Sequence, residues 1–349
     1  MSPESLIAGF SAPHTLSLSF ADVPIRVRTN DPDIRARLAS YYRRYVVADG
    51  PAPLADVNLI QGKVPVEGDF VDIPRAGRRA KEAIREVPGG RLILKRSTGA
   101  LMALWPGGAF ATGDIRANLN QGINLVNNCY AKVVLRRGHV LLHASAVVRD
   151  RRAAVLAGPP GAGKSTSALH LVEAGFHCLS NDRVLAKPLP DEVEALGYPK
   201  QPRVNPGTLL GHPRLSALLL PTDRAALAAL PPDELWELER KSDVDLDRIY
   251  GNGVVELRGR MVALVFLRWR RDGQGLGVRP LKVEEALDAL PIVYKNLGAF
   301  DLDRAPGSSM TDAERDRYRE LFGRVTLVEV TGGIDFAALV GVVEDLLSA

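Results

Sequence analysis

The chain has 349 residues, more than one hydrophobic core usually serves, so we expect two domains. Hydrophobic residues make up 46% and charged residues 25%, which is ordinary for a globular protein. The net charge of +4 is small, and bases and acids alternate along the chain, which argues against a nucleic-acid-binding surface. No apolar run approaches the ~20 residues of a membrane span. With Cys129 and Cys178 far apart and no signal pattern at the N-terminus, we expect a cytoplasmic protein without membrane contact.

Residues 1–138 are predicted to form a small α+β domain of unknown role. Asp31 and Pro32 predict a helix start, because Asp is a good N-cap and proline fits the first helical position. A long amphipathic helix is expected from near Asp114 to the turn at Gly138, where we place the domain boundary. The expected strands cover residues 14–28, 55–60 and 91–94.

Residues 139–349 are predicted to form a second, α/β domain, because strand patterns alternate with helical ones. A last helix is expected at 336–347, with apolar residues at helical spacing. The segment 188–253 is rich in proline, leucine and charge, and is predicted to be helical and irregular. The expected strands cover residues 140–148, 153–157, 176–179, 261–269 and 325–330.

The most specific motif is the run G-P-P-G-A-G-K-S at residues 158–165, a full match to the phosphate-binding pattern G-x-x-x-x-G-K-[ST]. An apolar strand precedes it and a helical run follows, which is the context the motif requires. Its glycines let backbone N–H groups cradle phosphates, and the helix N-terminus adds positive potential. Lys164 is expected to reach the terminal phosphates, and the Ser165 hydroxyl to bind Mg²⁺. The predicted nucleotide-binding residues are Gly158, Pro159, Pro160, Gly161, Ala162, Gly163, Lys164, Ser165 and Thr166.

Three further residues are candidates for chemistry. Asp182 follows the strand 176–179, where a carboxylate can hold Mg²⁺ or accept a hydroxyl proton, although a turn aspartate is the alternative. Glu256 precedes the strand 261–269, and by itself it reads as an ordinary surface glutamate. His143 interrupts an apolar strand, where a histidine is more often a core residue than a catalyst.

Taken in order, these motifs resemble the bacterial HPr kinase/phosphorylase family. That family carries a histidine in a strand before the phosphate loop, two acids after the next strand, and a later Glu-[Ile/Leu]-Arg-Gly signature. The corresponding segments here are 143–148, 158–165, 175–184 and 256–259. The resemblance covers roughly residues 140 to 270 and is strongest to the HPr kinase-related group, notably HprK-related kinase B. It implies a P-loop nucleotide-binding domain of the type shared by the HPr kinase C-terminal domain and phosphoenolpyruvate carboxykinase.

The resemblance implies a role for each matching residue. Lys164 would contact the phosphates as part of the catalytic set, and Ser165, Glu256 and Asp182 would hold the metal. Asp182 would also act as the general base, and His143 would support it.

The chain departs from the family pattern at two places. Asn181 stands where the family has its first acid, which removes a charge near the metal. Arg260 and Met261 replace the apolar-glycine continuation of the signature, and the spacing from Asp182 to Glu256 is longer.

The resemblance therefore implies an ATP-dependent kinase that uses Mg²⁺ to phosphorylate a hydroxyl, in the first instance serine, on an unidentified protein or small molecule. It also suggests a homo-oligomer. One alternative is an ATP-binding regulatory module without phosphoryl transfer, which Asn181 favours. The other is a phosphoenolpyruvate carboxykinase-like enzyme, which the chain length and the lack of a second lysine–histidine metal constellation disfavour.

Overall fold

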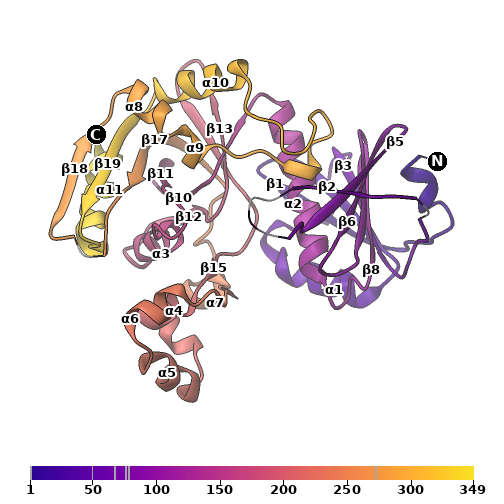
Figure 1. Cartoon of the computed structure of the whole chain (residues 1–349), viewed down its shortest axis with the longest axis horizontal. Coiled ribbons are helices and arrows are strands. Elements are labelled where there is room, and N and C mark those ends of the chain that lie inside the picture. Colours follow the sequence, from indigo (N-terminus) through magenta and orange to yellow (C-terminus); the bar gives the residue numbers. More distant parts are fainter. Residues whose placement is uncertain (1, 49, 67, 75–76, 78, 272) are drawn as a thin grey trace. The chain divides into compact units, whose positions relative to one another are not determined.

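The computed structural model describes residues 2–48, 50–66, 68–74, 77, 79–271 and 273–349. It is a mixed α/β structure with several sheets, and the chain divides into two compact units (Figure 1). Unit 1 holds the chain up to Gly138 together with Asn296–Met310, and unit 2 holds His139–Lys295 and Thr311–Ala349. The predicted second domain, residues 139–349, therefore contains a segment that packs with unit 1. Among the described residues, no helix combines the length and apolar character needed to cross a bilayer.

Unit 1 is built on an eight-stranded sheet in the order β1-β2-β3-β8-β7-β6-β5-β4. The β2–β3 and β3–β8 pairs are parallel, and the other pairs are antiparallel. The predicted single strand 14–28 is a hairpin, because Ala21 and Asp22 take positive φ angles of 45° and 66° and turn the chain. The strands are β1 (His14–Phe20), β2 (Val23–Thr29), β3 (Ala55–Gln61), β4 (Val71–Asp72), β5 (Glu82–Val87), β6 (Gly90–Lys95), β7 (Leu101–Trp105) and β8 (Gly108–Gly113).

Two helices pack on this sheet, α1 (Pro32–Tyr41) on β1 and β2, and α2 (Leu119–Arg136) on β2, β3 and β8. As the sequence predicts, the Asp31 carboxylate caps α1 by accepting backbone N–H groups of its first turn. Helix α2 begins five residues after the predicted Asp114. There the Asp114 carboxylate accepts the N–H of Ala117 in a turn that precedes the helix. The short 3-10 helices are η1 (Glu4–Leu6), η2 (Arg43–Tyr45) and η4 (Gly298–Phe300).

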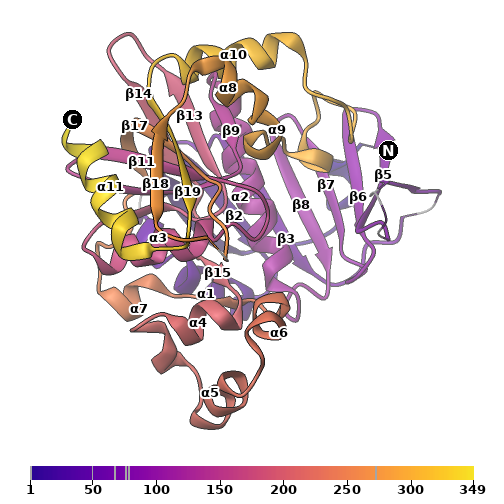
Figure 2. The same cartoon turned by 60° about the vertical axis from the view of Figure 1, so that its left-hand side comes forward.

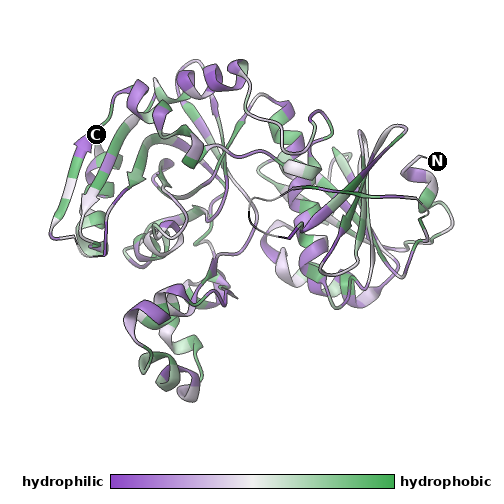
Figure 3. Cartoon of the chain, viewed as in Figure 1, coloured by the Kyte–Doolittle hydropathy of each residue, from purple (hydrophilic) through white to green (hydrophobic). Residues whose placement is uncertain are grey.

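Unit 2 contains a nine-stranded sheet in the order β12-β10-β11-β17-β14-β13-β9, with β19 added to β17 and β18 to β19. The β11–β17 and β17–β19 pairs are parallel. The strands are β9 (Val140–Leu142), β10 (Ala144–Arg149), β11 (Arg152–Ala157), β12 (His177–Ser180), β13 (Val184–Pro188), β14 (Val193–Gly197), β17 (Arg258–Leu267), β18 (Leu276–Pro280) and β19 (Thr326–Gly332). Figure 3 shows apolar residues concentrated in the strands of both units.

Helices cover both faces of the unit 2 sheet. Because side chains alternate along a strand, Val265 of β17 joins the core under α3 (Lys164–Glu173) and α11 (Phe336–Ser348), while Phe266 contacts Phe322 of α10 (Asp312–Phe322) on the other face. Figure 2 shows α3 and α11 over the same strands. The short helices α8 (Val283–Asp288) and α9 (Leu290–Val293) precede α10 in the chain.

The predicted strand 140–148 is broken at His143 into β9 and β10, which pair with different neighbours. The His143 backbone N–H donates to the carbonyl of Val293 instead of to a strand. This break turns His143 out of the ladder at the point where β10 begins.

Residues 198–253 leave the sheet after β14, and Val255 returns to it in a parallel bridge with Cys178 of β12, just before β17 begins. The two-stranded ladder of β15 (Arg203–Val204) and β16 (Ser242–Asp243) closes this excursion at its base. Its apolar residues Leu209, Leu215 and Leu246 join the core under α3. Its helices are α4 (Pro206–Gly211), η3 (Leu215–Leu218), α5 (Pro221–Ala228), α6 (Pro232–Glu237) and α7 (Leu246–Tyr250).

Candidate functional site

The glycine-rich loop, residues 158–163, connects the end of β11 to the start of α3. A Cβ on buried Gly158 would lie 2.9 Å from the carbonyl oxygen of Leu267, so only glycine fits there. Gly161 and Gly163 take φ angles of 83° and 78°, which side chains rarely adopt. A Cβ on Gly161 would meet no atom within 4 Å, so this backbone faces open space that a ligand can approach.

Lys164 and Trp269 hold the loop in this shape. The Lys164 ammonium donates to the carbonyls of Gly158 at 2.7 Å and Pro159 at 3.2 Å. The indole N–H of Trp269 donates to the carbonyl of Ala162 at 2.9 Å. Trp269 is only 8% exposed and follows the end of β17 by two residues, so this extension of β17 holds the loop in place.

The strand register brings the loop, His143 and Asp182 to one edge of the sheet, which we call the loop edge. Ala144, the first residue of β10, pairs with Ala157, the last residue before the loop. Strand β12 also ends at this edge, because its last residue pairs with β10 near the start of that strand. Asn181 and Asp182 follow directly, so they lie beside the loop.

Asp182 lies among positive groups. One carboxylate oxygen is 3.7 Å from Nε2 of His143, and the other is 3.6 Å from Nε of Arg183. Burial opposes ionisation of Asp182, but the charges of Arg183, Lys200, His143 and Lys295 outweigh it and hold the pKa of the carboxyl below its usual value. The carboxylate is therefore ionised at neutral pH.

The pKa values of the bases around Asp182 are lowered as well, which for a base favours the neutral form. Burial lowers the pKa of Lys164, although Asp182 partly offsets this effect. Burial and the charge of Lys164 lower the pKa of His143, so its imidazole is neutral at pH 7. A neutral imidazole that approaches Asp182 more closely can donate a hydrogen bond to it without cancelling the carboxylate charge.

Asn181 is 8% exposed, and among the described residues its Oδ1 accepts no hydrogen bond. Its backbone carbonyl is held by the Ser145 hydroxyl, which fixes the position of the turn. A buried amide oxygen without a donor is costly, so this atom is suited to a ligand that enters the site.

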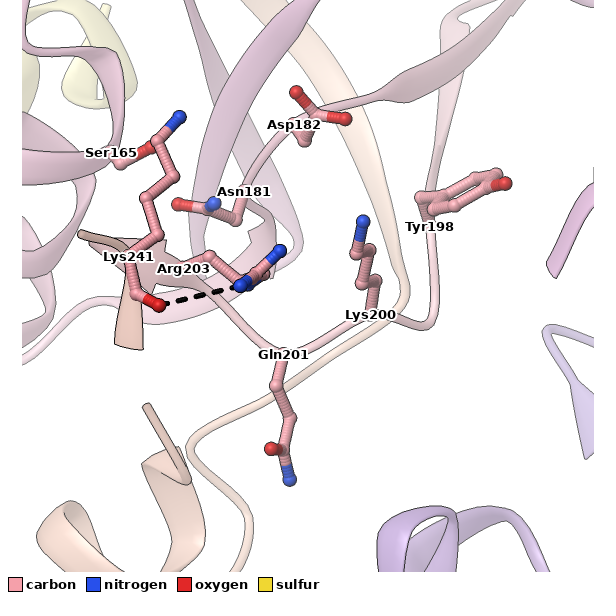
Figure 4. A pocket seen from close by; sticks show the side chains of 8 residues that line it. All are labelled: Ser165, Asn181, Asp182, Tyr198, Lys200, Gln201, Arg203 and Lys241. Carbon is pink, nitrogen blue, oxygen red and sulfur yellow. Dashed lines mark hydrogen bonds between the residues drawn. The ribbon is translucent and has the colours of Figure 1, made fainter. Parts of the chain in front are cut away.

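A cavity of about 150 Å³ opens at the loop edge (Figure 4). It unites two residues of the predicted site, Ser165 and Asp182, with others that the sequence analysis did not select. The lining residues are Ser165, Asn181, Asp182, Tyr198, Lys200, Gln201, Arg203 and Lys241. The short basic run after β14 was the available signal, but Lys241 is 38 residues from Arg203 in sequence, and only the β15–β16 ladder brings the two together.

The structure does not bring Glu256 to Ser165 and Asp182. The Glu256 carboxylate is 3.4 Å from Nδ1 of His177, which lies at the start of β12. Asp182 follows the other end of that strand, and the four residues of β12 span about 10 Å. Glu256 is therefore at the edge of the sheet opposite the loop.

The remaining loop residues differ in exposure. Pro159, Pro160 and Gly161 are exposed, while Ala162 and Gly163 are partly buried. The Thr166 hydroxyl is 2.9 Å from that of Thr208, so it links α3 to α4.

The donor atoms at the loop edge fit Mg²⁺. The Ser165 hydroxyl, the Asn181 amide oxygen and the Asp182 carboxylate are all hard oxygen donors lining one cavity. Among the described residues there is no cluster of three or more His, Cys, Asp or Glu side chains suited to a metal. A Mg²⁺ ion can be held by one carboxylate when substrate phosphates complete its coordination.

Comparison with solved structures gives a distant similarity. No family model matches the chain, and no curated protein matches it. Among solved structures, the chain is similar to the HPr(Ser) kinase/phosphatase from Coxiella burnetii, with 10% sequence identity and a TM-score of 0.28 over 60% of this chain and 93% of that one. A similarity at this level carries no argument about function.

Proposed function

We propose that the chain is an ATP-dependent phosphotransferase that transfers the γ-phosphoryl group to a hydroxyl. The observation that supports this most is the convergence of the glycine-rich loop, Lys164, Ser165 and Asp182 at one edge of the sheet, with Ser165 and Asp182 lining the same cavity. Phosphoryl transfer needs positioning and charge neutralisation more than covalent chemistry, and these residues supply both.

The loop backbone and Lys164 would bind the phosphates of ATP. The N-terminus of α3 adds partial positive charge at the same place. Mg²⁺, when bound by Ser165, Asp182 and Asn181, would neutralise charge on the phosphates. We assign no metal role to Glu256, because its carboxylate lies at the opposite edge.

Asp182 would orient the acceptor. The hydroxyl oxygen forms a bond to the γ-phosphorus as the bond from that phosphorus to the bridging oxygen breaks, and ADP leaves. The hydroxyl proton passes to the Asp182 carboxylate. Because the neighbouring charges keep its pKa low, Asp182 mainly orients the hydroxyl and takes the proton late in the step.

The first test is the loss of nucleotide binding in Lys164→Ala. Lys164 is half-buried at the start of α3 and is not part of the apolar core, so the variant should fold. In the wild type, Mg·ATP at 100 times its Kd should stabilise the protein by about 2.7 kcal/mol, measured as a thermal shift. The shift should vanish in Lys164→Ala and persist in Lys282→Ala, which changes an exposed lysine at the start of α8. An equal shift in all three proteins contradicts the proposal.

Asn181 favours a second candidate, a regulatory module that binds ATP without a phosphoryl acceptor. With an amide at position 181, Asp182 is the one carboxylate lining the cavity, and it would have to serve both as metal ligand and as base. Incubation of the protein with γ-labelled ATP and cell extract separates the two. A labelled species that appears with the wild type and disappears with Asp182→Asn supports the transferase. Nucleotide binding without any labelled acceptor supports the module.

A further inference from the structure

The cavity at the loop edge carries more positive charge than the nucleotide site accounts for. Its lining includes Lys200, Arg203 and Lys241 against the single carboxylate of Asp182. Lys164 and the start of α3 already serve the phosphates of ATP from the loop side. The binding of ATP phosphates by Lys164 and α3 therefore does not explain why Lys200, Arg203 and Lys241 also line this cavity.

The bases fall on two sides of Asp182. In Figure 4 the Lys241 side chain extends toward Ser165, and Lys241 is near enough to Lys164 for its charge to lower the pKa of that lysine, after burial and against the effect of Asp182. In Figure 4 Lys200 lies below Asp182, away from Ser165 and toward Tyr198. Lys241 thus belongs to the nucleotide side, and Lys200 faces the side from which an acceptor hydroxyl would reach Asp182.

Lys200 has no fixed counter-ion of its own. Arg203 pairs with Asp243 at 3.0 Å, whereas Lys200 forms no ion pair within the part of the chain that the structure describes. The carboxylate with the largest effect on it, Asp182, also interacts with Arg183 and Lys295, and Asp243 adds a smaller effect. Burial lowers the pKa of Lys200, so a bound anion would offset a real desolvation cost.

The backbone holds Lys200 in place before any ligand binds. The Tyr198 N–H donates to the Ser180 hydroxyl at 3.0 Å, and the Ser180 hydroxyl in turn donates to the carbonyl of Arg183. A Cβ on Gly197 would collide with the carbonyl of Leu179, so the chain leaves β14 tightly against β12. This segment therefore presents Lys200 at a defined distance from the turn that carries Asp182.

We propose that Lys200 binds an anionic group on the phosphoryl acceptor, so that the acceptor is a small hydroxyl compound carrying its own phosphate or carboxylate. This inference rests on the proposed phosphotransferase function, since Asp182 defines the acceptor side. The volume of about 150 Å³ suits a small molecule rather than a folded protein segment. An anion at Lys200 would hold the hydroxyl near Asp182 and reduce the entropy cost of reaching the γ-phosphate.

The test titrates a simple anion into the protein already saturated with Mg²⁺ and a non-hydrolysable ATP analogue. Inorganic phosphate and acetate are compared by calorimetry at constant ionic strength, which distinguishes a phosphate from a carboxylate site. The wild type should bind at least one of them. Lys200→Met should weaken that binding about 10-fold or more, which is 1.4 kcal/mol. Lys200→Arg should restore most of it, and Lys282→Met should match the wild type.

The nucleotide affinity is measured for the same variants. It should stay within a factor of about two in Lys200→Met, because Lys200 lies away from the loop. The inference is overturned if neither anion binds to the nucleotide-loaded protein, if Lys200→Met binds them as the wild type does, or if Lys200→Met loses nucleotide instead. Failure of the wild type to bind the ATP analogue at all would instead overturn the phosphotransferase proposal.

Discussion

At the scale of single residues, the central feature is a carboxylate that neighbouring positive charges keep ionised. Asp182 lies at the end of β12 with His143 and Arg183 within 4 Å, and Lys200 and Lys295 add to their effect. A carboxylate with a low pKa is a weak base but a strong hydrogen-bond acceptor. Its value to a reacting hydroxyl is therefore chiefly orientation.

Asp182→Asn tests that role. The amide keeps the shape and can still accept a hydrogen bond, but it cannot take the proton. We expect phosphoryl transfer to slow by about 10²–10⁴-fold, while ATP without Mg²⁺ still stabilises the protein, because the loop and Lys164 bind its phosphates. Single-turnover transfer of γ-labelled phosphate measures the rate, and a thermal shift measures the binding. A transfer rate equal to that of the wild type would remove Asp182 from the mechanism.

The pH dependence of transfer should be set by His143. The pKa of Asp182 is lowered, so it does not titrate near neutrality, and the pKa of His143 is lowered by burial and by Lys164, so it is neutral at pH 7. Because the pKa of His143 lies below its ordinary value, the rate should be flat near neutral pH and should fall only on acidification, where His143 gains a proton and its charge draws on Asp182. His143→Gln should remove the acidic fall. A fall that persists in His143→Gln would point to another group.

At the scale of elements, local signals predicted the parts of the site that lie within one strand–loop–helix unit. The motif at 158–165 placed the loop between β11 and α3, and the apolar runs located β11 and most of β17 and β19. The break at His143 was not predictable, because it depends on a hydrogen bond to Val293, which is distant in sequence. The position of Glu256 was not predictable for a similar reason, because the pairing of its segment with β12 decides which edge of the sheet it occupies.

The element that fixes the loop is the extension of β17, and Trp269 is its contact. Trp269→Phe keeps the edge-to-face packing on Phe336, where the ring centroids are 5.4 Å apart, but loses the hydrogen bond to Ala162. We expect the free energy of unfolding to fall by about 1–2 kcal/mol and nucleotide affinity to weaken. Urea denaturation and nucleotide titration measure the two effects.

Trp236→Phe is the matched control for this change. Trp236 is 45% exposed on α6 and contacts Arg271 through its ring face. A surface substitution of this kind should change stability by no more than about 0.5 kcal/mol. If both tryptophan variants bind nucleotide as the wild type does, the loop does not depend on the indole of Trp269.

At the scale of the whole molecule, the chain passes between the two units three times, at Gly138, at Lys295 and at Met310. The segment Asn296–Met310 belongs to unit 1, and Arg91 of β6 holds it there. The Arg91 guanidinium is 3% exposed and donates to the carbonyls of Ala299, Asp301 and Arg304. The sequence does not predict these contacts, because every residue type has a backbone carbonyl that can accept a hydrogen bond.

Arg91→Met should therefore release this segment. It leaves three carbonyls without their donor and Glu86 without its ion pair, so we expect unfolding free energy to fall by more than about 2 kcal/mol. Trypsin should cleave after Arg304 much faster than in the wild type, as read by mass spectrometry, while cleavage after exposed Arg324 in unit 2 should be unchanged. Arg91→Lys should be only partly protected, because an ammonium cannot reproduce the fork of a guanidinium that reaches three carbonyls. Equal cleavage after Arg304 in all three proteins would mean that other contacts hold the segment, and that Arg91 is not what ties this part of the chain to unit 1.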